Sequence, residues 1–207
     1  MRVLKKNLRG EEGEITLLPE SLDDLWHLQH LISRGDLVFA LTQRKVAPIA
    51  DKARPEKMEK KTVRLGVKVE DIEFHMYSNW LRLHGRIACG MDVGSYHTLN
   101  IEVGTDLSIL KYHWRPDMLA RIDEAVAESL RPKVVIALIE EGEATIGVLR
   151  QFGVQTAAEI SQGSGKGSGE DTRSGFLRDV AAAVDKAAGG GAEVILAGPG
   201  FTKEDLK

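Results

Sequence analysis

The feature that most constrains the fold is the regular alternation of apolar and polar residues between positions 61 and 87. A period of two places one set of side chains on a buried face and the other set in solvent, as in half-buried β-strands. The alternation predicts three short antiparallel strands, with tight connections at Glu70-Asp71 and at Ser78-Asn79. The apolar positions that define the strands are Val63, Leu65, Val67 and Val69, then Ile72, Phe74 and Met76, then Leu81, Leu83 and Ile87.

Segments on both sides of this stretch extend the pattern into a small β-domain. Ser21 is expected to cap a helix, with Asp24 as its capping-box partner and Gly35 at the helix end. Further strands are expected over residues 2–6, 13–19, 36–42, 97–103 and 108–114. One helix combined with a curled set of short antiparallel strands is typical of a small β-barrel.

A strongly basic segment, Gln43 to Arg64, lies between two of the expected strands and is interpreted as a long loop. It carries eight basic and three acidic side chains, a net charge of +5. A charged loop on a rigid β scaffold is a common way to present cations to a phosphate backbone. A solvated hairpin tip without a ligand is an equally reasonable interpretation of one charge run. The candidate RNA-binding residues are Arg44, Lys45, Lys52, Arg54, Lys57, Lys60, Lys61 and Arg64.

The sequence changes character after Pro116, which is well placed for the first turn of a helix. Beyond it, a continuous apolar run over 133–140 indicates a buried central strand, and the Gly/Ser-rich run 161–175 indicates a flexible loop. The other expected elements are a helix to residue 129, strands over 144–151 and 154–161, a second buried strand over 192–200, a helix over 175–188 and a helix start at residue 202. This order predicts an α/β layer domain. Because the chain stops at a helix start, we expect it to be part of a longer protein.

Composition excludes several classes of protein. The chain is 43% hydrophobic and 29% charged, and no apolar run reaches the length of a membrane helix or a signal peptide core. We therefore expect a cytoplasmic protein with no membrane partner. Cys89 is the only cysteine, so neither an intrachain disulfide nor a multi-cysteine metal site is possible, and we expect it to be a buried small hydrophobe.

Four other groups of residues invite a chemical interpretation, but in each case an ordinary structural role is favoured. No third metal ligand accompanies the pair His27 and His30, and no carboxylate is spaced to orient the imidazole of His97. The glycine-rich run lacks the spacing of a phosphate-binding loop, and acidic residues after a strand usually form a solvated turn. The four groups are His27 with His30, Tyr96 with His97, the run 163–169, and Glu140, Glu141 and Glu143.

Binding to RNA is therefore the function that the residues favour. A small β-barrel with a basic loop suits recognition of an RNA backbone. Aromatic residues are scarce near the basic segment, which argues against base stacking and for phosphate contacts with little sequence preference. Structured RNA such as ribosomal RNA fits a surface of this kind.

The chain resembles the Pelota family, ribosome-rescue factors of archaea and eukaryotes that are related to class I release factors. The resemblance covers most of the chain in the right order. The matching stretches are MRVLKKN, GEITLLPESLDDLWHLQHLI, GDLVFALTQRKV, VRLGVKVEDIEFHMYSNWLRLHGRI, GSYHTLNIEV and VILAGPGF.

The resemblance implies a mixed fold with two domains. Residues 1–125 would form an Sm-like RNA-binding β-barrel with a helix, and residues 126–207 would form part of a central α/β domain like that of release factors. The family also has a C-terminal domain that binds a translational GTPase, for which this sequence has no room. Pro199, Gly200 and Phe201 match a family element at the GTPase interface.

The resemblance also implies a function in ribosome rescue. Such a factor recognises ribosomes stalled with an empty A site, contacts ribosomal RNA at the decoding centre and mRNA, and promotes subunit dissociation and mRNA surveillance. It would act as a monomer delivered by an elongation-factor-type GTPase. The loop 161–175 lacks the Gly-Gly-Gln tip of release factors, although Gln162, Lys166 and Arg173 are present, so no peptidyl-tRNA hydrolysis is expected.

An alternative function is implied by the endoribonuclease activity attributed to archaeal family members. That activity requires a divalent metal cation, which would be the only cofactor. The sequence shows no convincing catalytic set in residues 1–125. The acidic residues near the basic segment are the candidate ligands, namely Asp36, Asp51, Glu56 and Glu59.

Overall fold

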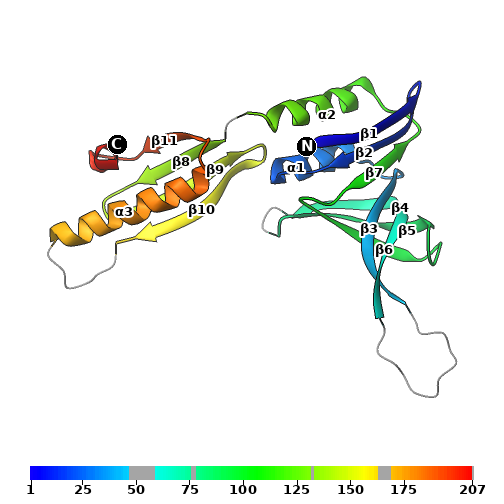
Figure 1. The fold of residues 1–207 in the computed structure, drawn as a ribbon, viewed down its shortest axis with the longest axis horizontal. Helices are drawn as coiled ribbons and strands as arrows, with labels where there is room; N and C mark the ends of the chain where they lie inside the picture. Colours follow the sequence, from blue (N-terminus) through cyan, green and yellow to red (C-terminus); the bar gives the residue numbers. More distant parts are fainter. Residues whose placement is uncertain (47–58, 76–77, 132, 163–168, 207) are drawn as a thin grey trace, which may run out of the picture. The chain divides into compact units, whose positions relative to one another are not determined.

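The computed structural model describes residues 1–46, 59–75, 78–131, 133–162 and 169–206, with the backbone alone at 45, 46, 59, 60 and 169–172. The chain divides into two compact units, Met1–Leu130 and Arg131–Lys207. The first unit is a β-rich domain with two helices, and the second combines a smaller sheet with one long helix (Figure 1).

The first unit is built on a seven-stranded antiparallel sheet with the order β1-β2-β7-β3-β4-β5-β6. Its strands are β1 (Arg2–Arg9), β2 (Glu12–Leu18), β3 (Leu37–Val46), β4 (Glu59–His75), β5 (Trp80–Cys89), β6 (Tyr96–Glu102) and β7 (Leu107–Lys111). The sheet is open, because β1 and β6 are its edges and no pairing between described residues joins them. The closed barrel expected from the sequence is therefore not confirmed. Closure depends on pairing between distant strands, which local alternation does not specify.

The predicted alternation explains which face of the sheet is buried. Along β5, Leu81, Leu83 and Ile87 are buried at 1% exposure or less, while the residues between them, except Gly85, are exposed. The helices α1 (Leu22–Leu31) and α2 (Pro116–Glu128) add their apolar faces to the same core. The core residues that the helices contribute are Leu25, Leu28 and Leu31 from α1 and Met118, Ile122 and Ala125 from α2.

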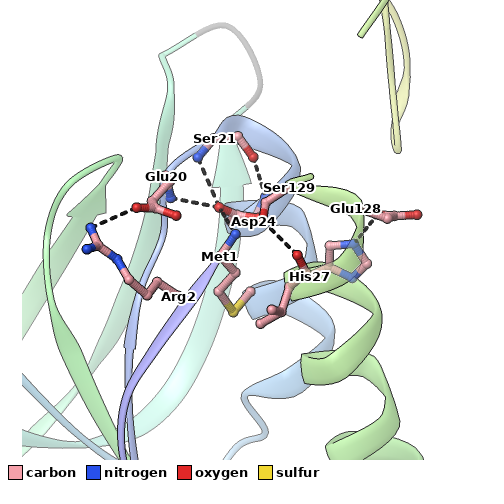
Figure 2. Close-up of polar contacts among 9 residues, drawn as sticks. Met1, Arg2, Glu20, Ser21, Asp24, His27, Glu128 and Ser129 are labelled. Atoms are coloured by element: carbon pink, nitrogen blue, oxygen red, sulfur yellow. Dashed lines mark hydrogen bonds and ion pairs between the residues drawn. The ribbon is translucent and has the colours of Figure 1, made fainter. Parts of the chain in front are cut away.

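The N-terminus of α1 is fixed by the buried carboxylate of Asp24 (Figure 2). Ser21 Oγ accepts a hydrogen bond from the backbone N–H of Asp24 at 3.2 Å, and Asp24 Oδ2 accepts one from the backbone N–H of Ser21 at 3.0 Å. This is the predicted capping box. Asp24 Oδ2 also lies 2.7 Å from the α-ammonium group of Met1, and both groups are almost completely buried. This ion pair, which the sequence did not predict, joins Met1, the residue before β1, to α1.

Two predicted boundaries in the first unit are wrong. No turn interrupts β4 at Glu70-Asp71, because the strand continues through a shift of register between Val69 and Asp71. A bulge and a turn both break the alternation, so a sequence pattern does not separate them. Helix α1 ends at Leu31 rather than at Gly35, which lies in the following turn with a φ of 94°.

The expectation that Cys89 is buried is also wrong. Cys89 is exposed at the end of β5, where it pairs in register with Gly66 of β4. By contrast, the turn expected at Ser78-Asn79 is confirmed, and Asn79 adopts the left-handed conformation with a φ of 58°.

The second unit contains a four-stranded sheet with the order β10-β9-β8-β11. Its strands are β8 (Val134–Ile139), β9 (Glu143–Arg150), β10 (Gly153–Ser161) and β11 (Glu193–Ala197), followed by the 3-10 helix η1 (Thr202–Leu206). The run expected to form a central strand is β8, which pairs antiparallel with β9 and parallel with β11. The expectation that the last strand is buried is wrong, because β11 is an edge of the sheet and its Val194 and Ile195 are exposed.

Helix α3 (Gly169–Ala188) packs on one face of this sheet (Figure 1). It begins earlier than the predicted start at residue 175. Phe176, Val180 and Val184 of the helix lie against the buried side chains of β8 and β9. Among the described residues, no helix is both long enough and apolar enough to span a membrane.

Candidate nucleic-acid interface

The basic segment forms the end of a long hairpin rather than a wide loop. β3 extends to Val46 and β4 begins at Glu59, so both strands run into the segment that the sequence indicated as loop. β4 pairs with β5 only from Gly66 onward, and β3 pairs with β7 only as far as Ala40. The arms beyond these points pair with each other and project from the sheet (Figure 1).

The register of the hairpin places basic residues opposite one another. Arg44 pairs with Lys61, and Lys45 pairs with Lys60 in the next position. The register thus gathers four basic positions at the end of the hairpin, an arrangement that suits contact with a polyanion.

The predicted RNA-binding residues fall into three sets. The side chains of Arg44, Lys61 and Arg64 are described, and the backbone alone is described at Lys45 and Lys60. The rest lie outside the described residues, namely Lys52, Arg54 and Lys57. Lys61 is exposed, and it forms no ion pair within the described part of the chain.

Arg44 is held by the turn between β5 and β6. Its Nε donates to Asp92 Oδ2 at 2.7 Å, and one terminal nitrogen lies 3.5 Å from His97 Nδ1. Because a guanidinium only donates, His97 Nδ1 is the acceptor, and Nε2 carries the proton that is donated to Thr42 Oγ1 at 3.0 Å. Burial lowers the pKa of His97, and the nearby charges of Arg44 and His84 lower it further.

The conformation of this turn depends on Asp92. Its φ is 54°, in the left-handed region that aspartate and asparagine tolerate better than other side chains. Gly90 and Gly94 flank it with φ values of 109° and 91°. The short carboxylate thus fits the turn and also reaches Arg44. Asp92 was not predicted from the sequence, in which the one available signal was an aspartate between closely spaced glycines.

Arg64 lies along the opposite face of the hairpin from Arg44. One of its terminal nitrogens is 3.7 Å from Asp106 Oδ2, and the other donates to Ser108 Oγ at 3.1 Å. Its side chain is still 46% exposed. Arg64 is therefore partly neutralised by the sheet, although solvent and a ligand can still reach it.

Of the acidic residues considered as metal ligands, only Asp36 has a described side chain, and it is engaged in structural contacts. Asp36 accepts a hydrogen bond from the backbone N–H of Ser33 at 2.7 Å and forms an ion pair with the buried Lys111. The side chains of Asp51, Glu56 and Glu59 are outside the described set. Within that set, no group of three or more His, Cys, Asp or Glu residues is arranged to hold a metal ion.

The histidines of α1 have structural roles. His27 is buried, and its Nε2 lies 3.0 Å from Glu128 Oε2 of α2 (Figure 2). His30 Nδ1 lies 2.8 Å from the backbone oxygen of Trp26. The two side chains are therefore committed to separate contacts, in agreement with the structural interpretation of this pair.

The Pro199-Gly200-Phe201 turn is well defined in the second unit. Lys203 Nζ donates to the backbone oxygens of Gly198 and Gly200, and Phe201 is 78% exposed. An anchored turn that presents an exposed phenyl ring is suited to contact with another protein. In the loop after β10, Gln162 donates its backbone N–H to the backbone oxygen of Gly142, while residues 163–168 lie outside the described ranges.

Comparison with known sequences identifies relatives along the whole chain. The sequence profile of the Pelota N-terminal domain matches residues 1–126. The pelota homolog of Methanothrix thermoacetophila is 69% identical over 207 residues, and that of Methanococcoides burtonii is 56% identical over the same length. These alignments cover 100% of this chain and 59% of each relative, so the chain spans about three fifths of their length.

Solved structures give the same relationship. A. fulgidus Pelota, from Archaeoglobus, is 43% identical with a TM-score of 0.50, and the match covers 100% of this chain and 54% of that chain. A ribosome-bound archaeal Pelota described with ABCE1 is 40% identical with a TM-score of 0.52, over 100% of this chain and 60% of that chain. Thermoplasma acidophilum Pelota, at 23% identity, shares the fold with a TM-score of 0.72 and 57% of its chain covered. The chain therefore belongs to the Pelota family.

Proposed function

We propose that this chain is the RNA-binding part of a translation factor that recognises ribosomes stalled with an empty A site. Membership of the Pelota family supports this function, as does a 40% identical relative described as ribosome-bound. The factor would promote subunit dissociation in the cytoplasm and thereby serve mRNA surveillance. In this proposal, residues 1–125 form the RNA-binding domain and residues 126–207 belong to the central domain.

The observation that carries the proposal is the projecting hairpin with its facing cations. Its arms extend beyond the pairing with neighbouring strands, and two basic pairs face each other along them. A narrow cationic finger of this kind can reach into a channel lined by phosphate groups. Contacts with the backbone do not depend on base sequence, which suits a factor that must act on any stalled message.

Peptidyl-tRNA hydrolysis is not part of the proposed function. The loop between β10 and α3 contains no Gly-Gly-Gln sequence, and so the glutamine that positions water in release factors has no counterpart there. Subunit dissociation is therefore the outcome we propose. The exposed Phe201, on its anchored turn, is proposed to contact a translational GTPase.

The test is binding to purified archaeal ribosomes by the Lys60→Glu/Lys61→Glu double variant over a range of salt concentrations. Each cation that neutralises a phosphate adds about one to the slope of log affinity against log salt. The variant is expected to bind more weakly and with a slope smaller by roughly two. Lys133→Glu/Lys186→Glu, which changes two exposed lysines of the second unit, is the matched control.

The control variant has the same net charge as the hairpin variant. It is expected to keep the affinity and slope of the unchanged chain. A hairpin variant that binds ribosomes with unchanged affinity and slope would remove the hairpin from the proposed mechanism. An equal loss in both variants would show that total charge, rather than the hairpin, determines binding.

A further inference from the structure

The solvent face of β5 and β6 carries an ordered set of cationic, aromatic and hydrogen-bonding side chains. Arg82, His84 and Arg86 alternate along β5 with the buried apolar residues, so all three point away from the core. Cross-strand register pairs each of them with a polar or aromatic residue of β6. The three pairs are Arg82 with Asn100, His84 with Thr98, and Arg86 with Tyr96.

Two rings on this face lie in parallel planes. The rings of His84 and Tyr96 are inclined by 3°, with centroids 5.5 Å apart, and Tyr96 is 53% exposed. The guanidinium carbon of Arg86 lies 4.8 Å from the Tyr96 centroid, and its terminal nitrogen donates to the Tyr96 hydroxyl at 2.9 Å. His84 Nδ1 lies 2.9 Å from Thr98 Oγ1. Each ring is thus held in a fixed orientation before any ligand binds.

The face is accessible along its outer border. β6 is an edge of the sheet, and the side chains of Arg82, His84, Arg86 and Tyr96 are all exposed. No stacking platform was expected from the sequence, because aromatic residues are scarce around the basic segment. Tyr96 and His97 are adjacent in β6, so their side chains point to opposite faces of the sheet, and the ring pair lies on the face opposite the contact of His97 with Arg44.

The charges on the neighbouring strand show what kind of contact the face can make. Arg86 Nε lies 3.4 Å from Glu70 Oε1, and an Arg82 terminal nitrogen lies 3.8 Å from Glu73 Oε2. These exposed, long ion pairs are weak and can be exchanged for contacts to a ligand. They nevertheless balance the local charge, so phosphate attraction alone would be small. Binding to this face must therefore come mainly from stacking.

We propose that the His84–Tyr96 ring pair, with Arg86 over the Tyr96 ring and Arg82 on the same face, is a second RNA-contact surface that stacks the bases of single-stranded RNA. Stacking on aromatic rings is tolerant of sequence, because every base presents a π-face. Cations beside the rings would contact the adjacent phosphates. The inference builds on the proposed function, because it gives the same unit base contacts in addition to the backbone contacts of the hairpin.

The experiment measures binding of a short fluorescently labelled oligoadenylate to the full chain by anisotropy. Tyr96→Ala is expected to lower affinity by about tenfold, in line with the loss of one stacked base. Tyr96→Phe keeps the ring and is expected to bind like the unchanged chain. Tyr112→Ala removes a tyrosine of the same unit that is 84% exposed, and it should also have no effect. Duplex RNA, whose bases are already stacked, should not distinguish these variants.

The salt dependence of binding distinguishes this surface from the hairpin. The Tyr96→Ala loss should persist at high salt, whereas the loss in the Lys60→Glu/Lys61→Glu variant should shrink as salt rises. Hairpin variants that fail to affect ribosome binding would remove the hairpin from the proposed mechanism and leave the Tyr96 result standing. Unchanged oligoadenylate affinity in Tyr96→Ala would overturn the second surface alone.

A measurement on the unchanged chain covers the case in which a variant does not fold. Titration with oligoadenylate should move the NMR signals of the Tyr96 and His84 ring protons upfield, because a stacked base shields them. The Tyr112 ring signals should stay in place. The proposal would be overturned if the ring signals of Tyr96 and His84 showed no upfield shift. It would also be overturned if the shift at Tyr112 were equally large.

Discussion

Arg44 Nε lies 2.7 Å from Asp92 Oδ2, so a strained turn between β5 and β6 is tied to the base of the basic hairpin. The Arg44 side chain is only 16% exposed, whereas Lys61, opposite it in register, is exposed to solvent. The two paired cations therefore have different roles. Arg44 fixes the direction in which the arm leaves the sheet, and Lys61 is available to a ligand.

The first prediction concerns this pair. In a double-mutant cycle of Asp92→Asn with Arg44→Gln, we expect a coupling free energy of about 0.5–1 kcal/mol. This is the usual range for a partly exposed charge-assisted contact. Asparagine is chosen because it tolerates the φ of 54° as aspartate does, so that only the charge is lost. Urea denaturation of the four proteins gives the coupling.

The control cycle pairs Asp92→Asn with Lys61→Gln. Lys61 faces Arg44 across the hairpin, but no ion pair with Asp92 is present. Its coupling to Asp92 is expected to be close to zero. Coupling as large as that of Arg44 would mean that Asp92 acts through the general field of the hairpin and not through the observed contact.

The second prediction is that the free energy of unfolding depends on pH through the titration of His97. Its pKa is lowered in the folded chain, first by burial and then by Arg44 and His84. The folded chain therefore binds fewer protons at this site than the unfolded chain. The stabilisation is complete above the unfolded pKa of about 6.5 and is lost as pH falls through the folded pKa. His97→Gln should therefore reduce stability less at acidic pH than at neutral pH.

Denaturation at two pH values, one above and one below about 6.5, measures this effect. Thr62→Ala, at an exposed position of the basic hairpin that carries no titratable group, is the control. Its effect on stability should be the same at both pH values. A His97→Gln variant with the same loss at both pH values would contradict the lowered pKa.

The sequence predicted most strands of the first unit but not the true extent of the hairpin. Alternating apolar residues identify a strand that has one buried face. The outer arms around Lys45 and Lys60 carry charged residues in place of alternating apolar ones, and among the described strands they pair only with each other. A charged stretch in such a strand therefore resembles a loop. The bulge at Asp71 was missed for a related reason, since it interrupts alternation as a turn does.

The functional details that the sequence could not supply depend on contacts between distant residues. The capping box of Ser21 and Asp24 is local and was predicted correctly. The Asp24 contact to the Met1 ammonium and the bracing of Arg44 by Asp92 join segments that no periodicity relates. The family resemblance, which uses the whole chain, was confirmed by the comparisons.

The third prediction tests the buried ion pair at the N-terminus. Asp24→Asn keeps the shape of the side chain but leaves the Met1 ammonium, which is 1% exposed, without its counter-charge. Breaking a buried pair at one partner costs about 3 kcal/mol or more. Asp71→Asn, at an exposed pair with Arg34, should cost less than about 1 kcal/mol. Equal effects in urea denaturation would show that the buried pair stabilises the fold no more than the exposed pair does.

The last prediction contrasts two glycines. Gly85 of β5 faces Val69 beside the bulge, and a Cβ added there would lie 2.0 Å from the backbone oxygen of Lys68. Because backbone must move to accept it, Gly85→Ala should destabilise the first unit by about 3 kcal/mol. Gly175 of α3 has open space at its Cβ position, so Gly175→Ala should stabilise the helix by roughly 0.5–1 kcal/mol. Thermal unfolding measures both changes, and a Gly85→Ala chain as stable as the unchanged chain would contradict the tight β4–β5 approach.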